Sequence, residues 1–143
     1  MIACYVDSSF QVAAYIRDAH SPEAVRRLST GPSICVTPFN RSELANAIYR
    51  QVFLGKLSSA VAQQAWDNFE KDCRQGVWDC REFPHRSWET CVDLARRFAS
   101  TLGIRTLDSL HVACALELRA ERFWTFDDRQ ARLAEAVGLD TKG

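Results

Sequence analysis

Short apolar segments, separated by longer stretches with helix signals, constrain the fold of this chain most strongly. Segment 2–6 is apolar, rich in β-forming residues and followed by Asp7, which is typical of a buried strand. Comparable short segments lie at 33–36, at 122–126 and, with a weaker pattern, at 79–83. Because strands alternate with helices, we predict an α/β fold, a single domain over 1–143 in which helices flank a central, mainly parallel sheet.

Caps, prolines and glycines indicate where the helices begin and end. Ser21-Pro22 and Thr37-Pro38 each place a capping side chain before a proline, a common start for a helix. The helix that starts at Thr37 should stop at Gly55, and the next, capped by Ser58, should form a helical hairpin with it. The predicted helices run over 8–19, from 21 to about 31, and over 37–54, 58–76, 85–102 and 106–120, the last of these capped by Thr106. A final helix runs from a cap at Asp127 or Asp128 to 137, and a short edge strand begins at 138–139.

The composition is that of an ordinary globular protein, with 143 residues of which 47% are hydrophobic and 25% charged. No apolar run approaches the roughly 20 residues needed to span a bilayer. The first residues lack the basic region of a signal peptide, so we expect a cytoplasmic protein. The six cysteines include no C-x-x-C pair and several lie in apolar stretches, so we interpret them as small hydrophobic residues rather than disulfide or zinc-binding residues.

The charges of the chain are balanced, with 18 basic and 18 acidic residues and a formal net charge of zero. A protein that coats nucleic acid without specificity usually carries an excess of basic residues, so the balance disfavours that class. A nuclease stays open, because locally separated charge can serve the same purpose.

Four acids are predicted to lie at one edge of the sheet. Asp7 follows the first strand, and Asp127 follows the apolar end of the strand at 122–126. Glu43 and Asp108 lie near the starts of two helices. Helix starts share an edge with the ends of the strands that precede them, and open parallel sheets bind ligands at that edge. The four carboxylates can therefore converge.

Convergence of several carboxylates would favour a bound cation. Carboxylates a few ångströms apart repel one another and take up protons unless a cation lies between them. Oxygen ligands suit a hard cation, Mg²⁺ or Mn²⁺, which also binds phosphate oxygens. A water on such a cation becomes acidic enough to attack a phosphodiester. The cluster thus indicates metal-dependent phosphodiester hydrolysis.

Each acid also has a purely structural explanation. Asp7, Asp108 or Asp127 would serve as a helix cap, and Glu43 on an exposed helix face would be solvated and idle. Asp7 is the strongest candidate for the site, because a carboxylate directly after an apolar strand needs a partner.

Three neutral residues near the acids are further candidates. Ser9 and Thr125 would either orient waters on the metal or act as ordinary caps and strand-end hydroxyls. His111 lies three residues after Asp108 among apolar neighbours, so we interpret it as a packed core residue rather than a general base.

Four segments resemble the motifs of one nuclease family, in the same order. YVDSS at 5–9 is similar to the opening motif of PIN-domain nucleases, most closely the VapC-type toxins of prokaryotic toxin–antitoxin pairs. SEL at 42–44 resembles the second motif, TLDSLHVACA at 106–115 the third, and FWTFD at 123–127 the fourth. With the spacing and the total length, the resemblance covers essentially the whole chain.

The resemblance implies a PIN-like nuclease domain with Mg²⁺- or Mn²⁺-dependent endoribonuclease activity. Its catalytic and metal-binding residues, directly or through water, would be Asp7, Glu43, Asp108 and Asp127. It also implies an RNA substrate, a homodimer and a cognate antitoxin whose tail blocks the site. Asp127 is assigned as the ligand because it follows Thr125 at the family's spacing, whereas Asp128 either caps the last helix or shares in the site.

Other classes of protein fit less well. A haloacid-dehalogenase-like phosphatase needs a second aspartate two residues after the first, where this chain has Ser9. A phosphate-receiving regulatory domain needs a late lysine, and the final third of the chain contains only Lys142. The open alternative is a catalytically inactive PIN-like module that binds RNA or protein, which would show no Mn²⁺-dependent gain in thermal stability.

Overall fold

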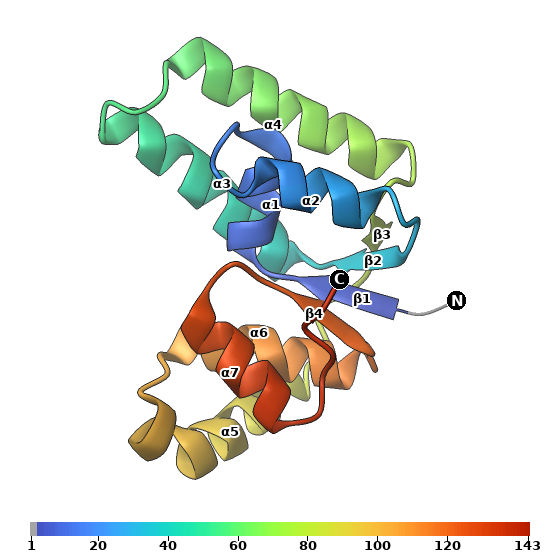
Figure 1. Ribbon diagram of the computed structural model, residues 1–143, viewed down its shortest axis with the longest axis vertical. Coiled ribbons are helices and arrows are strands. Elements are labelled where there is room, and N and C mark those ends of the chain that lie inside the picture. Colours follow the sequence, from blue (N-terminus) through green and yellow to red (C-terminus); the bar gives the residue numbers. More distant parts are fainter. Residues whose placement is uncertain (1–2) are drawn as a thin grey trace.

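The computed structural model describes residues 3–143, and within them seven helices flank a four-stranded sheet (Figure 1). The strands are β1 (Ala3–Val6), β2 (Ser33–Val36), β3 (Asp79–Cys80) and β4 (Arg122–Trp124). The helices are α1 (Ser8–Tyr15), α2 (Ser21–Leu28), α3 (Pro38–Phe53), α4 (Ser59–Arg74), α5 (Ser87–Leu102), α6 (Thr106–Glu117) and α7 (Asp128–Ala136). No helix in this part of the chain is both long and apolar enough to cross a membrane.

The four strands are all parallel and lie in the order β3-β2-β1-β4. The register places Tyr5 of β1 between Cys35 of β2 and Phe123 of β4. The carboxyl ends of these strands therefore meet at one edge of the sheet, where open parallel sheets bind ligands. The predicted α/β fold with a parallel sheet is confirmed.

Both faces of the sheet are covered by helices. Alternate strand residues point to opposite faces: Cys4 and Val6 pack in a core with residues of α1–α4, whereas Tyr5 packs with residues of α5–α7. Trp124 and Phe123 of β4 divide between the two cores in the same way. Figure 1 shows these layers, with α1–α4 on one side of the sheet and α5–α7 on the other. Burial on both faces explains why the strands are apolar throughout.

Several predicted bounds are wrong by a few residues. α1 ends at Tyr15 rather than at 19, because Asp18 and Ser21 form a turn in which Ser21 Oγ donates to the carbonyl of Ile16 at 3.1 Å. The strands predicted at 79–83 and 122–126 shorten to β3 and β4. The edge strand predicted to begin at 138–139 is reduced to a single parallel bridge between Asp140 and Arg122. Residue 2 of the predicted first strand lies outside the described residues.

Three of the predicted helix caps are confirmed and two are wrong by one residue. Thr37 caps α3 in a capping box with Asn40, Ser58 caps α4, and Asp127 rather than Asp128 caps α7. The predicted caps Ser21 and Thr106 are instead the first helical residues of α2 and α6, since the residues before them hold the N-cap positions.

All six cysteines carry free thiols, and four of them are buried: Cys4, Cys35, Cys91 and Cys114. Cys4 and Cys114 lie in the cores on the two faces of the sheet. Burial raises the pKa of the Cys4 thiol to about 12 and that of Cys114 to about 11. The interpretation of these buried cysteines as small core residues is confirmed.

Candidate active site

A pocket of about 460 Å³ lies where the strands end, and all four predicted acids line it. Its lining comes from four segments: Asp7, Ser8 and Ser9 at the start of α1, Glu43 on α3, Arg105, Thr106, Leu107, Asp108 and His111 at the start of α6, and Asp127 and Gln130 at the start of α7. Asp128 does not line the pocket. The structure thus brings together the four acids that are far apart in the sequence.

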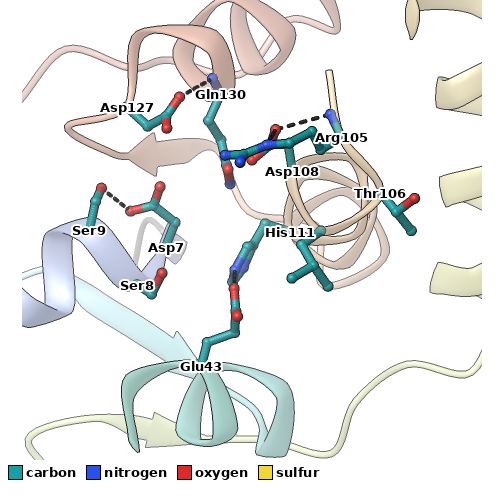
Figure 2. Close-up of a pocket in the computed structure, with 11 residues that line it drawn as sticks. Asp7, Ser8, Ser9, Glu43, Arg105, Thr106, Asp108, His111, Asp127 and Gln130 are labelled. Atoms are coloured by element: carbon teal, nitrogen blue, oxygen red, sulfur yellow. Dashed lines mark hydrogen bonds and ion pairs between the residues drawn. The ribbon is translucent and has the colours of Figure 1, made fainter. Parts of the chain in front are cut away.

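The four acids enter the pocket from different sides (Figure 2). Asp7 and Asp127 come after the neighbouring strands β1 and β4, which are paired in register. Glu43 reaches the pocket from α3, and Asp108 comes from the first turn of α6. Each acid is therefore positioned by the end of a strand or by the early part of a helix.

Asp7 is buried, with only 3% of its surface exposed. Its Oδ1 accepts hydrogen bonds from the Phe10 N–H at 3.1 Å and from Ser9 Oγ at 2.6 Å, and its Oδ2 accepts one from Thr125 Oγ1. The bond from Phe10 makes Asp7 the N-cap of α1, so Asp7 is both a cap and a pocket residue. Burial raises the pKa of the Asp7 carboxyl, while the nearby His111 and these hydrogen bonds act in the opposite direction.

The hydroxyls of Ser9 and Thr125 connect Asp7 to the end of β4. Ser9 Oγ donates to Asp7 and accepts from the Phe126 N–H at 2.9 Å. Thr125 Oγ1 donates to Asp7 and accepts from the Asp127 N–H at 2.9 Å. Because both hydroxyl protons are directed at Asp7, these residues orient its carboxylate.

A buried histidine holds Glu43 in place. His111 Nε2 lies 2.9 Å from Glu43 Oε1, and Nδ1 lies 2.7 Å from the Tyr5 hydroxyl. A carboxylate only accepts hydrogen bonds, so Nε2 carries the proton directed at Glu43. Nδ1 is hydrogen-bonded to the hydroxyl of Tyr5, whose pKa is raised by burial. Phe39 packs on the imidazole with ring centroids 4.3 Å apart. His111 is buried as predicted, but it also lines the pocket and orients Glu43.

Asp108 and Asp127 are each held through one carboxylate oxygen. Asp108 Oδ2 accepts from the Arg105 N–H at 3.1 Å and lies 3.6 Å from the guanidinium Nε of the same residue. Asp127 Oδ1 accepts from the Gln130 N–H at 3.0 Å, which makes Asp127 the N-cap of α7. Within residues 3–143, the second oxygen of each carboxylate accepts no hydrogen bond and is available to a ligand.

The described acids do not form a closed metal cage, and their carboxylate oxygens suit a hydrated cation. In the described part of the chain, no three His, Cys, Asp or Glu side chains lie close enough together to hold a metal ion by themselves. Mg²⁺ commonly binds one or two carboxylates and keeps several waters, through which more distant acids can act. The donors are carboxylate oxygens, and a cation would stabilise the charge of the buried Asp7. The residues therefore fit Mg²⁺ or Mn²⁺ in this hydrated form.

Sequence reasoning misses three residues of this site. Tyr5 lies inside an apolar strand, where nothing indicates that its hydroxyl contacts His111. Gln130 looks like any polar residue of an amphipathic helix, yet it is buried in the pocket wall. Arg105 directly precedes the segment that carries Asp108, and a basic residue beside a predicted acid is the one signal that could have identified it.

Comparison with known proteins gives a family and a fold. The PIN domain family model matches residues 4–136, whereas no curated protein sequence matches the chain. The Mycobacterium tuberculosis toxin VapC20, described as cleaving the sarcin–ricin loop, has a similar structure with a TM-score of 0.72 at 16% identity, over 98% of this chain and 99% of that one. VapBC2 from Rickettsia felis, bound to a DNA fragment from their promoter, has a TM-score of 0.68 at 14% identity, over 99% of this chain and 98% of that one.

A third similar structure is FitAcB from Neisseria gonorrhoeae, with a TM-score of 0.66 at 13% identity, over 98% of this chain and 96% of that one. At these identities the likeness concerns the fold. The family model, in contrast, spans nearly all of the sequence from β1 to the end of α7. The chain therefore belongs to the PIN domain family.

Proposed function

We propose that this protein is a Mg²⁺- or Mn²⁺-dependent endoribonuclease, that it acts as the toxin of a toxin–antitoxin module, and that residues 1–143 form one nuclease domain. One observation carries the proposal: acids from four separate segments line a single pocket at the carboxyl edge of a parallel sheet. Nuclease chemistry is the use of such a pocket that agrees with membership of the PIN domain family.

The proposed catalytic and metal-binding residues are Asp7, Glu43, Asp108 and Asp127. A divalent cation among them would polarise the phosphodiester and lower the pKa of a water for the attack. The surrounding residues keep the carboxylates in position: Ser9 and Thr125 orient Asp7, and His111 orients Glu43. Without bound positive charge, four acids in one pocket would repel an RNA phosphate.

The toxin role and the partners are inferred by analogy with the similar structures. VapC20 is described as a toxin that cleaves the sarcin–ricin loop. We accordingly infer a cytoplasmic protein with an RNA substrate and a cognate antitoxin. A homodimer is inferred in addition from the apolar surface at the end of α3, where Phe53 is 88% exposed and Leu54 is also exposed.

Incubation of the purified protein with total cellular RNA tests the nuclease activity. We expect the wild type to cleave RNA with Mn²⁺ and to stop in EDTA. Asp7→Asn should lower the rate roughly a thousandfold or more, because it removes the charge that holds the cation. Asp93→Asn is the matched control, since Asp93 is exposed on α5 and lies outside the pocket, and it should cleave at a rate close to that of the wild type.

Undiminished cleavage by Asp7→Asn, or by the wild type in EDTA, would overturn the metal-dependent mechanism. RNA binding without any cleavage would instead support an inactive RNA-binding module. Expression in cells tests the toxin role separately, because the wild type should arrest growth unless its antitoxin is co-expressed, and Asp7→Asn should be tolerated. Cleavage in vitro without growth arrest would retain the nuclease and reject the toxin.

A further inference from the structure

Gln130 places an unpartnered amide in the wall of the acid pocket. It lies in the first turn of α7, is only 3% exposed and lines the pocket. Its Nε2 is buried and has no hydrogen-bond partner within residues 3–143. Figure 2 shows the side chain extending from α7 toward the middle of the pocket. A buried amide without a partner costs free energy, so its position here indicates a ligand that accepts its hydrogen bond.

Arg105 reaches the same pocket from the start of α6. Its side chain is 71% exposed, and its Nε lies 3.6 Å from Asp108, a distance too long for a strong ion pair. Figure 2 shows this side chain extending from α6 toward the side of the pocket where Gln130 lies. Arg105 can therefore contact an anion that enters the pocket.

The positive surface continues outward along α7. Arg129 and Arg132 are both exposed and, at a spacing of three residues, lie on one side of the helix. Together with Arg105 they line a second hollow of about 430 Å³, which shares Arg105 and Asp127 with the acid pocket. Asp127 and Asp128 are the acids of this hollow, so its three arginines outnumber them.

Within residues 3–143, six of the other twelve arginines form an ion pair with an acid. Glu23, for example, pairs with both Arg26 and Arg27. Arg129 and Arg132, in contrast, form no ion pair with any residue in 3–143. Because the formal net charge is zero, attraction for a polyanion has to come from a local excess of this kind.

We propose that Gln130, Arg105, Arg129 and Arg132 form the phosphate-binding side of the pocket. Gln130 donates its free N–H to the phosphate that lies at the acids, and the arginines bind phosphates that follow it along one strand of RNA. Guanidinium groups suit this role because they pair with two phosphate oxygens at once. The inference rests on the proposed function in taking RNA as the ligand, and it assigns a role in binding, which can be measured without cleavage.

Gln130→Met tests the inner part of this surface, because methionine has a similar length and lacks the amide. Gln11→Met is the matched control, since Gln11 is a buried glutamine with an unpartnered amide that does not line the pocket. Both changes are made in the Asp7→Asn protein, which should not cleave measurably, with Mn²⁺ present so that the remaining acids of the pocket do not repel the RNA. The probe is a fluorescein-labelled single-stranded RNA of mixed sequence, about 12 nucleotides long, followed by fluorescence anisotropy.

We expect Gln130→Met to weaken RNA binding about tenfold and Gln11→Met to leave it unchanged, since only Gln130 loses a bond to a charged ligand. Neither change should lower the melting temperature, because each removes a buried amide that lacks a partner in the free protein. Equal RNA affinities for the two variants would overturn the role of Gln130.

A double variant, Arg129→Gln with Arg132→Gln, tests the outer part. Its control is the double variant Arg50→Gln with Arg74→Gln, which removes two exposed arginines of α3 and α4. Neither arginine forms an ion pair within residues 3–143, and neither lines the acid pocket or the hollow. Each phosphate contact on single-stranded nucleic acid contributes about 0.7 to the slope of log affinity against log salt, so the slope should fall by about 1.4 in the α7 variant alone.

If both double variants bind the RNA as tightly as the Asp7→Asn protein, the arginine surface does not bind RNA, and a protein partner becomes its better occupant. An Asp7→Asn protein with no measurable affinity for the RNA would overturn the proposal as well. Failure of the proposed function is seen separately, as a wild type that does not cleave RNA with Mn²⁺.

Discussion

Asp7→Asn and Asp7→Ala should differ clearly in stability when no metal is present. Asp7 Oδ1 accepts hydrogen bonds from the Phe10 N–H and Ser9 Oγ, and Oδ2 accepts one from Thr125 Oγ1. Asparagine keeps one carbonyl oxygen for the Oδ1 bonds, and it caps helices about as well as aspartate does. Alanine removes the acceptors for all three donors.

The structure sets the size of the two effects. Loss of the cap on α1 costs about 1 kcal/mol, and hydroxyls left without their acceptor raise the cost of Asp7→Ala to about 2–3 kcal/mol. Asp7→Asn loses only the bond from Thr125, worth about 1 kcal/mol. That loss is opposed by removal of a carboxylate whose charged form is disfavoured by burial. We expect the asparagine variant to lie within about 1 kcal/mol of the wild type, and to be the more stable protein if relief of the buried charge dominates.

Denaturant unfolding near neutral pH in EDTA measures both differences in the free energy of unfolding. An alanine variant as stable as the asparagine variant would mean that the hydrogen bonds around Asp7 contribute nothing, and the reasoning from its geometry would be refuted. Repeating the measurement with Mn²⁺ adds a second comparison, because a bound cation stabilises only the folded state. The wild type should gain stability, and a gain of equal size in Asp7→Asn would exclude Asp7 as a ligand.

In EDTA, the free energy of unfolding should depend on pH through Asp7, because burial raises the pKa of this carboxyl in the folded state. The stabilisation that Asp7 contributes is fully present below the ordinary carboxyl pKa and is lost as the pH rises through the raised value. The free energy of unfolding of the wild type, minus that of Asp7→Asn, should fall as the pH rises over that interval. A difference that does not change with pH would contradict the raised pKa of Asp7. His111→Gln keeps an N–H directed at Glu43, whereas the shorter side chain of His111→Asn does not. Calorimetry should therefore show a nearly unchanged Mn²⁺ affinity for His111→Gln and a loss of about tenfold or more for His111→Asn. Equal affinities of the two variants would mean that His111 does not position Glu43. Light scattering at micromolar concentration should show a dimer that Phe53→Glu dissociates, and a monomeric wild type would reject the proposed dimer.

Much of the fold can be predicted because buried parallel strands are short and apolar on both faces. β2 has the predicted bounds, 33–36. β4 is shorter than its apolar pattern, because its partner β1 ends at Val6, opposite Trp124. The excess length predicted for α1 has a different cause, since the turn around Asp18 depends on side-chain hydrogen bonds that helix propensity does not reveal.

The acids of the pocket can be predicted from the sequence, whereas the contacts that hold them in place cannot. An acid after an apolar strand or at a helix start has a position that the sheet topology determines. The contacts of Thr125 with Asp7 and of Tyr5 with His111 join residues more than 100 positions apart, at separations of 118 and 106. Such contacts depend on the direction of single side chains after folding. The same holds for Gln130, which enters the pocket wall where α6 and α7 pack together.

Anomalous diffraction from a crystal of the wild type grown with Mn²⁺ tests the central claim most directly, since that claim is that the acid pocket binds a divalent cation. The expected result is an anomalous peak inside the pocket, at direct ligand distance from Asp7, with other acids contacting the ion directly or through water. The peak should be absent from crystals of Asp7→Asn grown in the same way. A pocket without manganese in the wild type, or a peak that persists unchanged in Asp7→Asn, would contradict the assignment of this pocket as a metal-dependent nuclease site.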